Sequence, residues 1–442
     1  YKFPGHKFFS WSLSLSIAFP AYVYAFIYVG IFEYASPVSE YLRNFNISLP
    51  QIKNIYGASL IMAMALFPYI FLLTKAHLGS VGIKVFKAAK SLGDTNITAI
   101  RKVIIPSLWP TIIAGMALVI FETIADFGGV STLRVDTFTV GIYDAWFGYQ
   151  SYFSATRLAG FLLLFVFLIM FLAKYFGEKS VHLASKTAET FERIETTPIV
   201  RIGMLIFCSL IFIIVFCIPT TQLIVWNLAD SNLNLISNLQ LLINSLIVGL
   251  LASVITVFFA IALALSYKHS NILKSSILIS SSGYAIPGSV ISAGLLVGID
   301  YIFDTSITFY GILGLLMCLS LRFMTPAFNY ISASLSNISR SAEHALTTLP
   351  RDSFKAFKLF YLPQMKPAIF LSLMLVFIES IKEQPATLLL RPIGFDTLST
   401  KIYNFTSEGQ WEMAAVPSLF LVSMSLIFVY LINKNIDLNR DK

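Results

Sequence analysis

Residues 91–110 read SLGDTNITAIRKVIIPSLWP, a polar stretch with two prolines. The segments beside it, 60–74 and 111–121, contain no charged residue. Proline is favoured in the first turn of a helix, where its missing N–H has no helical partner in any case. The stretch therefore separates two apolar helices, and Pro106 marks where the second one begins.

The composition indicates a membrane protein built from helices. Of the 442 residues, 57% are hydrophobic and 12% are charged, whereas about a quarter of the residues in a soluble domain are charged. The apolar runs are continuous and near the ~20 residues that a bilayer requires, which favours helices over a barrel. We therefore predict an all-α polytopic protein with ten spans, at 8–32, 55–74, 106–125, 157–176, 201–219, 241–266, 275–299, 308–331, 364–382 and 413–433.

The basic residues fix the orientation of these spans. With the N-terminus inside, most of the 31 Lys and Arg residues fall in inner segments, as cytoplasmic loops require. The stretch 91–110 is then cytoplasmic. The net charge of +8 is explained by such loops, and no nucleic-acid partner is expected.

An internal repeat relates residues 88–134 to 345–391. Two prolines, a glutamate and an arginine match in register, which shared apolar composition would not readily produce. Both copies have the same predicted sidedness, so the repeat is parallel and two similar halves would enclose a pathway. The matched polar and proline pairs are Pro106/Pro363, Pro110/Pro367, Glu122/Glu379 and Arg134/Arg391.

The repeat predicts the organisation of the chain. A first permease-like repeat covers 1–176, a polar cytoplasmic linker covers 177–200, and a second repeat covers 201–442. The spans at 201–219 and 241–266 have no counterpart in the first repeat. We expect that about two N-terminal spans are missing from it; a natively asymmetric chain is the alternative.

The cytoplasmic stretch KAAKSLGDTNITAIRKVIIP (87–106) resembles the EAA loop of binding-protein-dependent ABC importer permeases. Lys87 replaces the glutamate of the family pattern. In the second copy, 344–363, Pro350 replaces its glycine, so docking there could differ. The resemblance implies that the residues coupling the chain to an ATPase are Ala88, Ala89, Gly93, Pro106, Ala345, Pro350 and Pro363.

The residues of the first loop suit a coupling element. Residues 83–92 can form a short amphipathic helix, and Ala88 and Ala89 are small enough for close packing against a partner. Gly93 would end this helix in the left-handed conformation. Asp94 or Thr95 can cap the helix that follows.

The resemblance covers almost the whole chain and is nearest to the iron(III)-type permeases, which fuse two halves. The segments 121–129 and 381–403 look like the signature stretches of that subfamily. It implies the type I (MetI-like) importer fold in a multi-pass protein of the bacterial inner membrane. The implied substrate is ferric iron from a periplasmic binding protein, with thiamine, polyamine or phosphonate as alternatives.

The chain has no Walker A motif, which P-loop ATPases require. It is therefore expected to be a transport subunit without a cofactor of its own, and not an enzyme. ATP and magnesium would bind to a separate ATPase subunit, present in two copies by the plan of the family. An ion-coupled secondary transporter or channel is the alternative from a different class.

Four carboxylates are the candidate residues of the translocation pathway. Glu122 and Glu379 lie near the outer ends of the third and ninth spans, followed four residues later by Asp126 and Glu383. This spacing predicts that each pair shares a helix face. Carboxylate oxygens suit a hard cation, and Lys382 would offset part of the charge. We expect transient contacts and no stable metal site; the alternative is that these residues anchor helix ends.

Arg134 and Arg391 match in the outer loops. They could pair locally with Asp136 and Asp396, or with acidic groups of a binding protein. Local pairing is the preferred interpretation.

Overall fold

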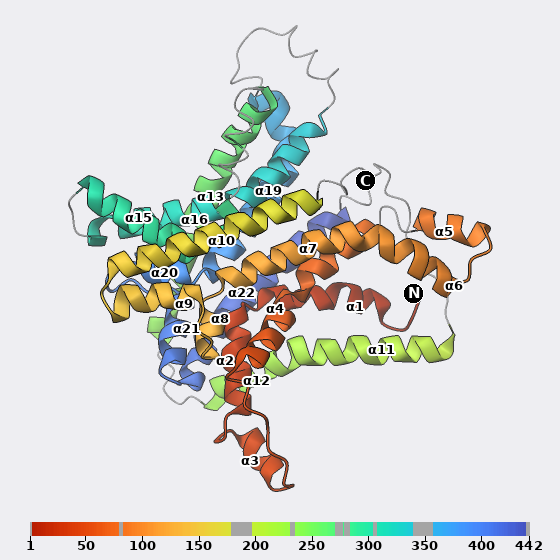
Figure 1. Cartoon of the computed structure of the whole chain (residues 1–442), viewed down its shortest axis with the longest axis horizontal. Coiled ribbons are helices and arrows are strands. Elements are labelled where there is room, and N and C mark those ends of the chain that lie inside the picture. Colours follow the sequence, from red (N-terminus) through yellow and green to blue (C-terminus); the bar gives the residue numbers. More distant parts are fainter. Residues whose placement is uncertain are drawn as a thin grey trace.

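The computed structural model describes residues 2–78, 83–177, 197–229, 235–269, 277, 283–303, 307–338 and 357–438. Within these ranges all regular structure is helical, which confirms the all-α class. Figure 1 shows the arrangement. We refer to residues 1–176 as the first half and to 201–442 as the second half.

The first half contains α1 (His6–Ser12), η1 (Leu13–Ala18), α2 (Ala21–Phe32), α3 (Pro37–Arg43), α4 (Ile55–His77), α5 (Ile83–Ser91), α6 (Asn96–Ala99), η3 (Ile100–Ile104), α7 (Ile105–Ala125), α8 (Gly128–Thr132), α9 (Phe138–Tyr143), η4 (Asp144–Gly148) and α10 (Tyr152–Gly177). After the predicted linker follow α11 (Pro198–Phe212), η5 (Ile213–Cys217), α12 (Ile218–Ala229), α13 (Leu235–His269), η6 (Gly283–Ala285), α15 (Gly288–Phe303), α16 (Ile307–Ser336), η7 (Phe357–Tyr361), α19 (Leu362–Lys382), α20 (Pro385–Leu390), α21 (Leu398–Ser407) and α22 (Trp411–Leu438). The segments η1 and η6 are 3-10 turns, and η3, η4, η5 and η7 are π-helical.

Eight helices of the described chain are long and apolar enough to cross a membrane. The expected span at 8–32 corresponds to two helical segments, His6–Ala18 and Ala21–Arg43, which meet at an angle of 91°. Pro20 causes the break: it lacks an N–H, and it holds the preceding Phe19 in extended conformation. Counted as one crossing, the bent pair is a ninth span.

The expected span at 275–299 lies partly outside the described residues. Its described part repeats the arrangement at Pro20, since η6 is followed by Pro287 and then by α15. Both halves therefore place a 3-10 turn and a proline directly before a helix.

Three of the π-helical segments named above directly precede a helix with proline at its second residue. They are η3 before Pro106, η5 before Pro219 and η7 before Pro363. A proline ring clashes with the carbonyl four residues earlier, and a π segment is one way to accommodate such a disturbance.

The two halves are interleaved. After the linker, α11 and η5 return to pack against α1 and η1, and α12 packs against α2; Figure 1 shows α11 beside α1. In the other direction, α10 packs against α15 of the second half. Both large hydrophobic cores consequently contain residues from both halves.

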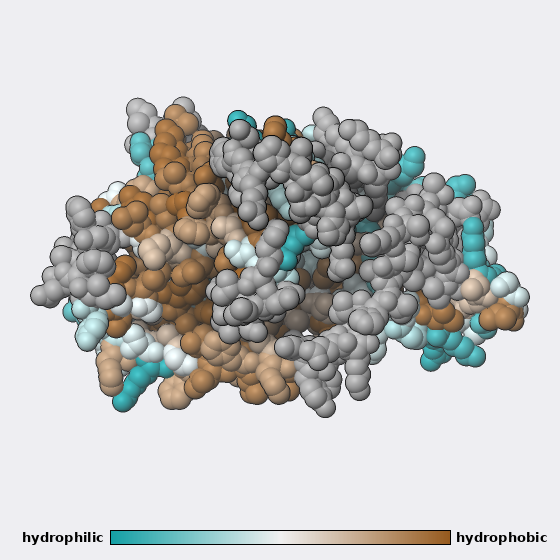
Figure 2. Space-filling view, turned by 90° about the horizontal axis from the view of Figure 1, so that it is seen from above, coloured by the Kyte–Doolittle hydropathy of each residue, from teal (hydrophilic) through white to brown (hydrophobic). Residues whose placement is uncertain are grey.

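The central helix α13 makes the halves unequal. It packs against both α16 and α19, whereas no helix of the described chain takes the matching place on α4 and α7. In their most apolar windows, 67% of the α16 span is buried against 44% of α4, and 33% of the α19 span against 11% of α7. Figure 2 shows a broad apolar surface, with hydrophilic residues mostly toward its edges.

Two tyrosines of α2 hold η5 in place across the halves. The Tyr24 hydroxyl donates to the Val215 carbonyl at 2.7 Å, and the Tyr28 hydroxyl donates to the Ile214 carbonyl at 2.6 Å. The amide four residues after Val215 and five after Ile214 belongs to Pro219 and has no hydrogen. The tyrosines therefore satisfy the carbonyls that Pro219 leaves without a helical donor, as an apolar environment requires.

We predict that Tyr24→Phe destabilises the protein by about 1–3 kcal/mol, because it leaves a buried carbonyl unsatisfied. In a Pro219→Ala background the loss should be smaller, since the substituted alanine restores an amide donor at that position. Thermal unfolding of the four proteins of this double-mutant cycle in detergent measures the difference. Tyr149→Phe, at a tyrosine 81% exposed, is the control; equal losses in both backgrounds would contradict the explanation.

Candidate functional site

A charged cavity lies where the two halves meet, next to the break at Pro20. It encloses about 720 Å³ of empty space, part of it open to the outside. Its walls come from η1, α2, α4, α7 and α8 of the first half and from α16, α19 and α20 of the second. All four predicted pathway carboxylates line it, namely Glu122, Asp126, Glu379 and Glu383.

The predicted helix-face arrangement of these carboxylates is wrong. Asp126 and Glu383 are the first residues after α7 and α19, and both have extended backbones, with ψ of 139° and 117°. Each carboxylate turns toward the next short helix. An Asp126 oxygen accepts from the Val130 N–H at 3.0 Å, and Glu383 accepts from the Ala386 N–H at 3.5 Å.

In the second half, two cations accompany the carboxylates. Arg322 of α16 donates to Glu383 at 2.9 Å, and both side chains are only 6% exposed. The Lys382 ammonium lies 3.9 Å from a Glu379 oxygen. Lys382 therefore lies where it can offset charge, as expected, whereas the partner of Arg322 was not predicted from the sequence.

Lys382 also reaches across to the first half. Its ammonium donates to the Ile17 carbonyl at 2.8 Å. In the 3-10 turn η1, the donor to that carbonyl would be the amide of residue 20, which is a proline. The lysine thus supplies the hydrogen bond that the break removes.

The carboxylates of the first half have no matching cations. In the repeat register, Ala125 stands at the position of Lys382, and the alignment of Pro68 with Pro326 places Met64 at that of Arg322. Within the described part of the chain, neither Glu122 nor Asp126 forms an ion pair.

Three tyrosines add oxygen atoms around the carboxylates. Tyr284 of η6 lies within electrostatic range of Glu122 and of Tyr69 of α4. The hydroxyl of Tyr22 on α2 is buried in the cavity wall without a hydrogen-bond partner among the described residues. These tyrosines were not predicted from the sequence, although Tyr22 and Tyr284 lie within three residues of the matched Pro20 and Pro287.

Two glycines let the backbone approach these polar groups. A Cβ at Gly128 would lie 1.7 Å from the Gln384 Oε1 atom. A Cβ at Gly288 would lie 2.2 Å from a Glu383 oxygen and 2.7 Å from the Arg322 guanidinium. Any larger residue at these positions would displace the groups that line the cavity.

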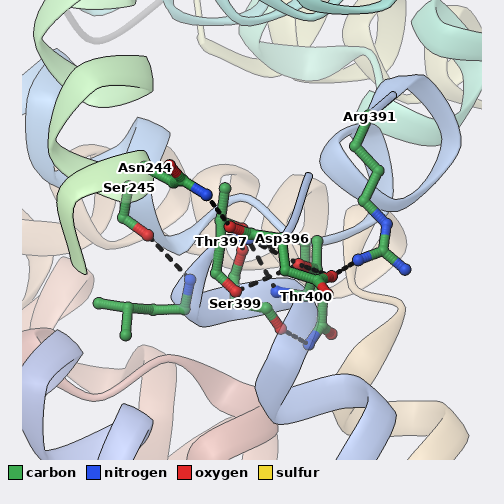
Figure 3. Close-up of polar contacts among 9 residues, drawn as sticks. Asn244, Ser245, Arg391, Asp396, Thr397, Ser399 and Thr400 are labelled. Atoms are coloured by element: carbon green, nitrogen blue, oxygen red, sulfur yellow. Dashed lines mark hydrogen bonds and ion pairs between the residues drawn. The ribbon is translucent and has the colours of Figure 1, made fainter. Parts of the chain in front are cut away.

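The outer loop of the second half is tied to α13 (Figure 3). Asn244 donates to the Asp396 carbonyl at 2.8 Å, and the Ser245 hydroxyl accepts from the Leu398 N–H at 2.8 Å. Arg391 forms an ion pair with Asp396, so the expected local pairing is confirmed for this half. Burial lowers the pKa of the Arg391 guanidinium, which nevertheless stays charged.

The matching loop of the first half is built differently. Arg134 is exposed and has a left-handed backbone with φ of 55°. It lines a second, polar cavity with Glu33, Lys53 and Glu408. Among the described residues Arg134 forms no ion pair, so the expected pairing with Asp136 is not found.

The first coupling loop has the expected conformation. The amphipathic helix is α5, Gly93 follows it with φ of +91°, and Thr95 caps α6 by accepting from the Thr98 N–H. Ala88 is exposed, but Ala89 is buried against Phe86, Ala99 and Ile104. Ala88 therefore belongs to the free surface, together with Leu92 and Ile97, which are 87% and 78% exposed.

The other predicted coupling residues belong to the starts of helices or to the second loop. Pro106 and Pro363 lie in the first turns of α7 and α19. Ala345 and Pro350 lie outside the described residues. Figure 1 shows α5 and α6 at the opposite end of α7 from α8 and α9.

We predict that Arg322→Met destabilises the protein by about 3–5 kcal/mol, because it leaves the buried Glu383 carboxylate unpaired. Adding Glu383→Gln should recover much of that loss. Thermal unfolding in detergent measures both variants.

The control is Lys53→Met, because Lys53 lies 3.6 Å from Glu33 with side chains 33% and 40% exposed. Removing such an exposed pair should cost about 0–1 kcal/mol. A loss at Arg322 no greater than the loss at Lys53 would contradict the buried pairing.

Comparisons with known proteins place this geometry in context. Residues 1–181 match the family described as "Binding-protein-dependent transport system inner membrane component". The Fe(3+)-transport system permease protein FbpB 2 of Haemophilus influenzae is 27% identical over an alignment that covers 98% of this chain and 84% of that protein.

Shorter alignments join two further relatives. The ferric transport system permease protein FbpB of Actinobacillus pleuropneumoniae is 32% identical over 28% of this chain and 18% of its own length. The sulfate transport system permease protein CysT of Salmonella typhimurium is 28% identical over 29% of this chain and 46% of its own length. The expected resemblance to importer permeases of the iron(III) type is thereby confirmed.

Proposed function

We propose that this chain, a multi-pass protein of the bacterial inner membrane, is the permease subunit of a binding-protein-dependent ATP-driven importer, and that its substrate is ferric iron. The permease assignment rests on the family match and on the eight apolar helices. The iron assignment rests on the near full-length relative named for Fe(3+) transport and on the carboxylate-lined cavity.

The carboxylates that line the cavity favour a cation as the substrate. Carboxylate oxygens are suited to hard cations. They would repel an anion such as sulfate. The relatives named for sulfate transport also align with less than a third of this chain. Thiamine and polyamines are also cationic and remain the alternatives to test; a phosphonate is disfavoured by its negative charge.

Two further kinds of protein complete the proposed importer. ATP and magnesium bind to a separate ATPase, of which two copies dock on the coupling loops, and a periplasmic binding protein delivers the substrate. The exposed apolar side chains of Ala88, Leu92 and Ile97 support docking at the first loop. Exposed apolar groups on a cytoplasmic loop are typical of a surface that a partner covers.

A continuous helical path joins the docking loop to the cavity. From Asn96 to Ala125, α6, η3 and α7 form one span. The docking surface lies at its cytoplasmic end and Glu122 near the other. A displacement of the loop by the ATPase would therefore move the carboxylate, which is how closure of the ATPase would alternate access to the pathway.

We predict that Glu122→Gln combined with Glu379→Gln lowers the initial rate of ferric iron uptake roughly tenfold or more, equivalent to about 1.4 kcal/mol. The loss follows from removing charged oxygens that contact the ion, and ATPase association should not change. Uptake is measured in proteoliposomes with Fe(III)-loaded binding protein, beside thiamine- and polyamine-loaded ones. Glu412→Gln, at an exposed glutamate, is the control; unchanged uptake in the double variant would rule out the role.

We predict that Leu92→Asp reduces copurification of the ATPase subunit in mild detergent by about tenfold or more, because burying this leucine is worth about 1.5–3 kcal/mol. Ile393→Asp, at a residue 92% exposed in an outer loop, should have no effect. If no ATPase accompanies even the unaltered chain, an ion-coupled transporter becomes the better explanation.

A further inference from the structure

The charges around the cavity do not balance. Four carboxylates and two cations line it, and both cations come from the second half. Arg322 is bound to Glu383, while Lys382 lies beside Glu379 and donates to the Ile17 carbonyl. The second half is therefore close to neutral, and the excess negative charge belongs to Glu122 and Asp126.

Uncompensated carboxylates are costly at such a place. A charged group removed from water needs a partner or it takes up a proton. Asp126 has the Val130 N–H as a hydrogen-bonded partner at 3.0 Å, and the Tyr284 side chain lies near Glu122. Neither contact supplies a positive charge.

Two neutral oxygens face the same region without partners. Tyr22 is 5% exposed and Gln384 is 2% exposed, and among the described residues neither the Tyr22 hydroxyl nor the Gln384 Oε1 atom has a hydrogen-bond partner. Both residues line the cavity. A buried oxygen without a donor is unusual, and a bound ion or water is one way to satisfy it.

The glycine pair 128–129 lets three side chains pack closely against the backbone. A Cβ at Gly128 would lie 1.7 Å from the Gln384 oxygen and 2.9 Å from the Cβ atom of Tyr22. A Cβ at Gly129 would lie 2.8 Å from an Asp126 carboxylate oxygen. Gln384, Tyr22 and Asp126 therefore share one part of the cavity wall, where the glycines leave room for them.

We propose that the first-half side of the cavity is a binding subsite for a hard multivalent cation, with Asp126 and Glu122 as charged ligands and Tyr22 and Gln384 as neutral oxygen ligands. Arg322 and Lys382 occupy the equivalent place on the second-half side as built-in counter-ions. The identity of the cation as a transported ion rests on the proposed function.

The asymmetry suits passage rather than storage. Four carboxylates free to bind would chelate a trivalent ion tightly. Arg322 and Lys382 instead pair with Glu383 and Glu379, which leaves two carboxylates for the ion. The first-half side keeps Glu122 and Asp126 as its charged ligands. The subsite therefore offers enough charge to attract a cation and too few charged ligands to retain it.

Terbium(III) luminescence tests the subsite. Terbium is a hard trivalent cation whose emission is excited through nearby tyrosines, and Tyr22, Tyr69 and Tyr284 line or adjoin the cavity. The purified full chain in detergent is titrated, and the midpoint of the titration is compared rather than its amplitude, because Tyr22 is itself a sensitiser. We expect saturable emission from the unaltered chain.

Variants on the two sides should act in opposite directions. Asp126→Asn should weaken terbium binding about tenfold or more and Tyr22→Phe severalfold, by the usual effect of lost metal contacts. Lys382→Gln should strengthen binding, because it frees Glu379. Misfolding would not produce such a gain. Glu408→Gln, at an exposed glutamate, should leave the midpoint unchanged.

Two outcomes would overturn the subsite: no saturable emission from the unaltered chain, as expected if Asp126 is simply protonated, or a midpoint that Asp126→Asn leaves unchanged. The result is separable from the proposed substrate. Failure of Fe(III)-loaded binding protein to drive uptake, with terbium binding still dependent on Asp126, removes the iron assignment alone. Iron uptake with terbium binding independent of Asp126 removes the subsite alone.

Discussion

A backbone carbonyl inside a membrane must have a donor, and this constraint shapes the centre of the protein. Pro20 interrupts a helix and leaves the Ile17 carbonyl without its amide partner. The donor comes from Lys382, far away in the other half. This one hydrogen bond gives the Ile17 carbonyl a donor, joins the two halves and places a cation beside Glu379. At Pro219, tyrosine hydroxyls act as the donors to the affected carbonyls in place of an ammonium.

The sequence alone was sufficient where the controlling physics is local or periodic. The apolar runs predicted the helical class, and the Gly93 and Thr95 positions predicted the turn after α5, because left-handed glycines and threonine caps act over a few residues. The repeat matches the two carboxylates of the first half with the two of the second, and all four line one cavity. Their matched positions in the sequence were enough to predict that they belong to one site.

What could not be predicted depends on contacts between distant segments. Arg322 meets Glu383 across 61 residues, and no periodicity relates them. The helix-face expectation failed because a helix was assumed to continue through Asp126, where the chain instead becomes extended to cap α8. The bend at Pro20 was missed because an apolar run of the right length conceals a change in direction. The predicted division into halves and linker remains a prediction, although packing interleaves the two halves.

The π segments before Pro106 and Pro363 also bear on the internal repeat. Residues 100–104 and 357–361 adopt the same irregular turn at corresponding places in the two copies. Each turn precedes a matched proline, whose ring clashes with the carbonyl four residues earlier, so the shared turn follows from the shared proline. The counter-ions Arg322 and Lys382 are found in one copy alone. The two copies therefore enter the membrane through the same local geometry but surround the cavity with different charges.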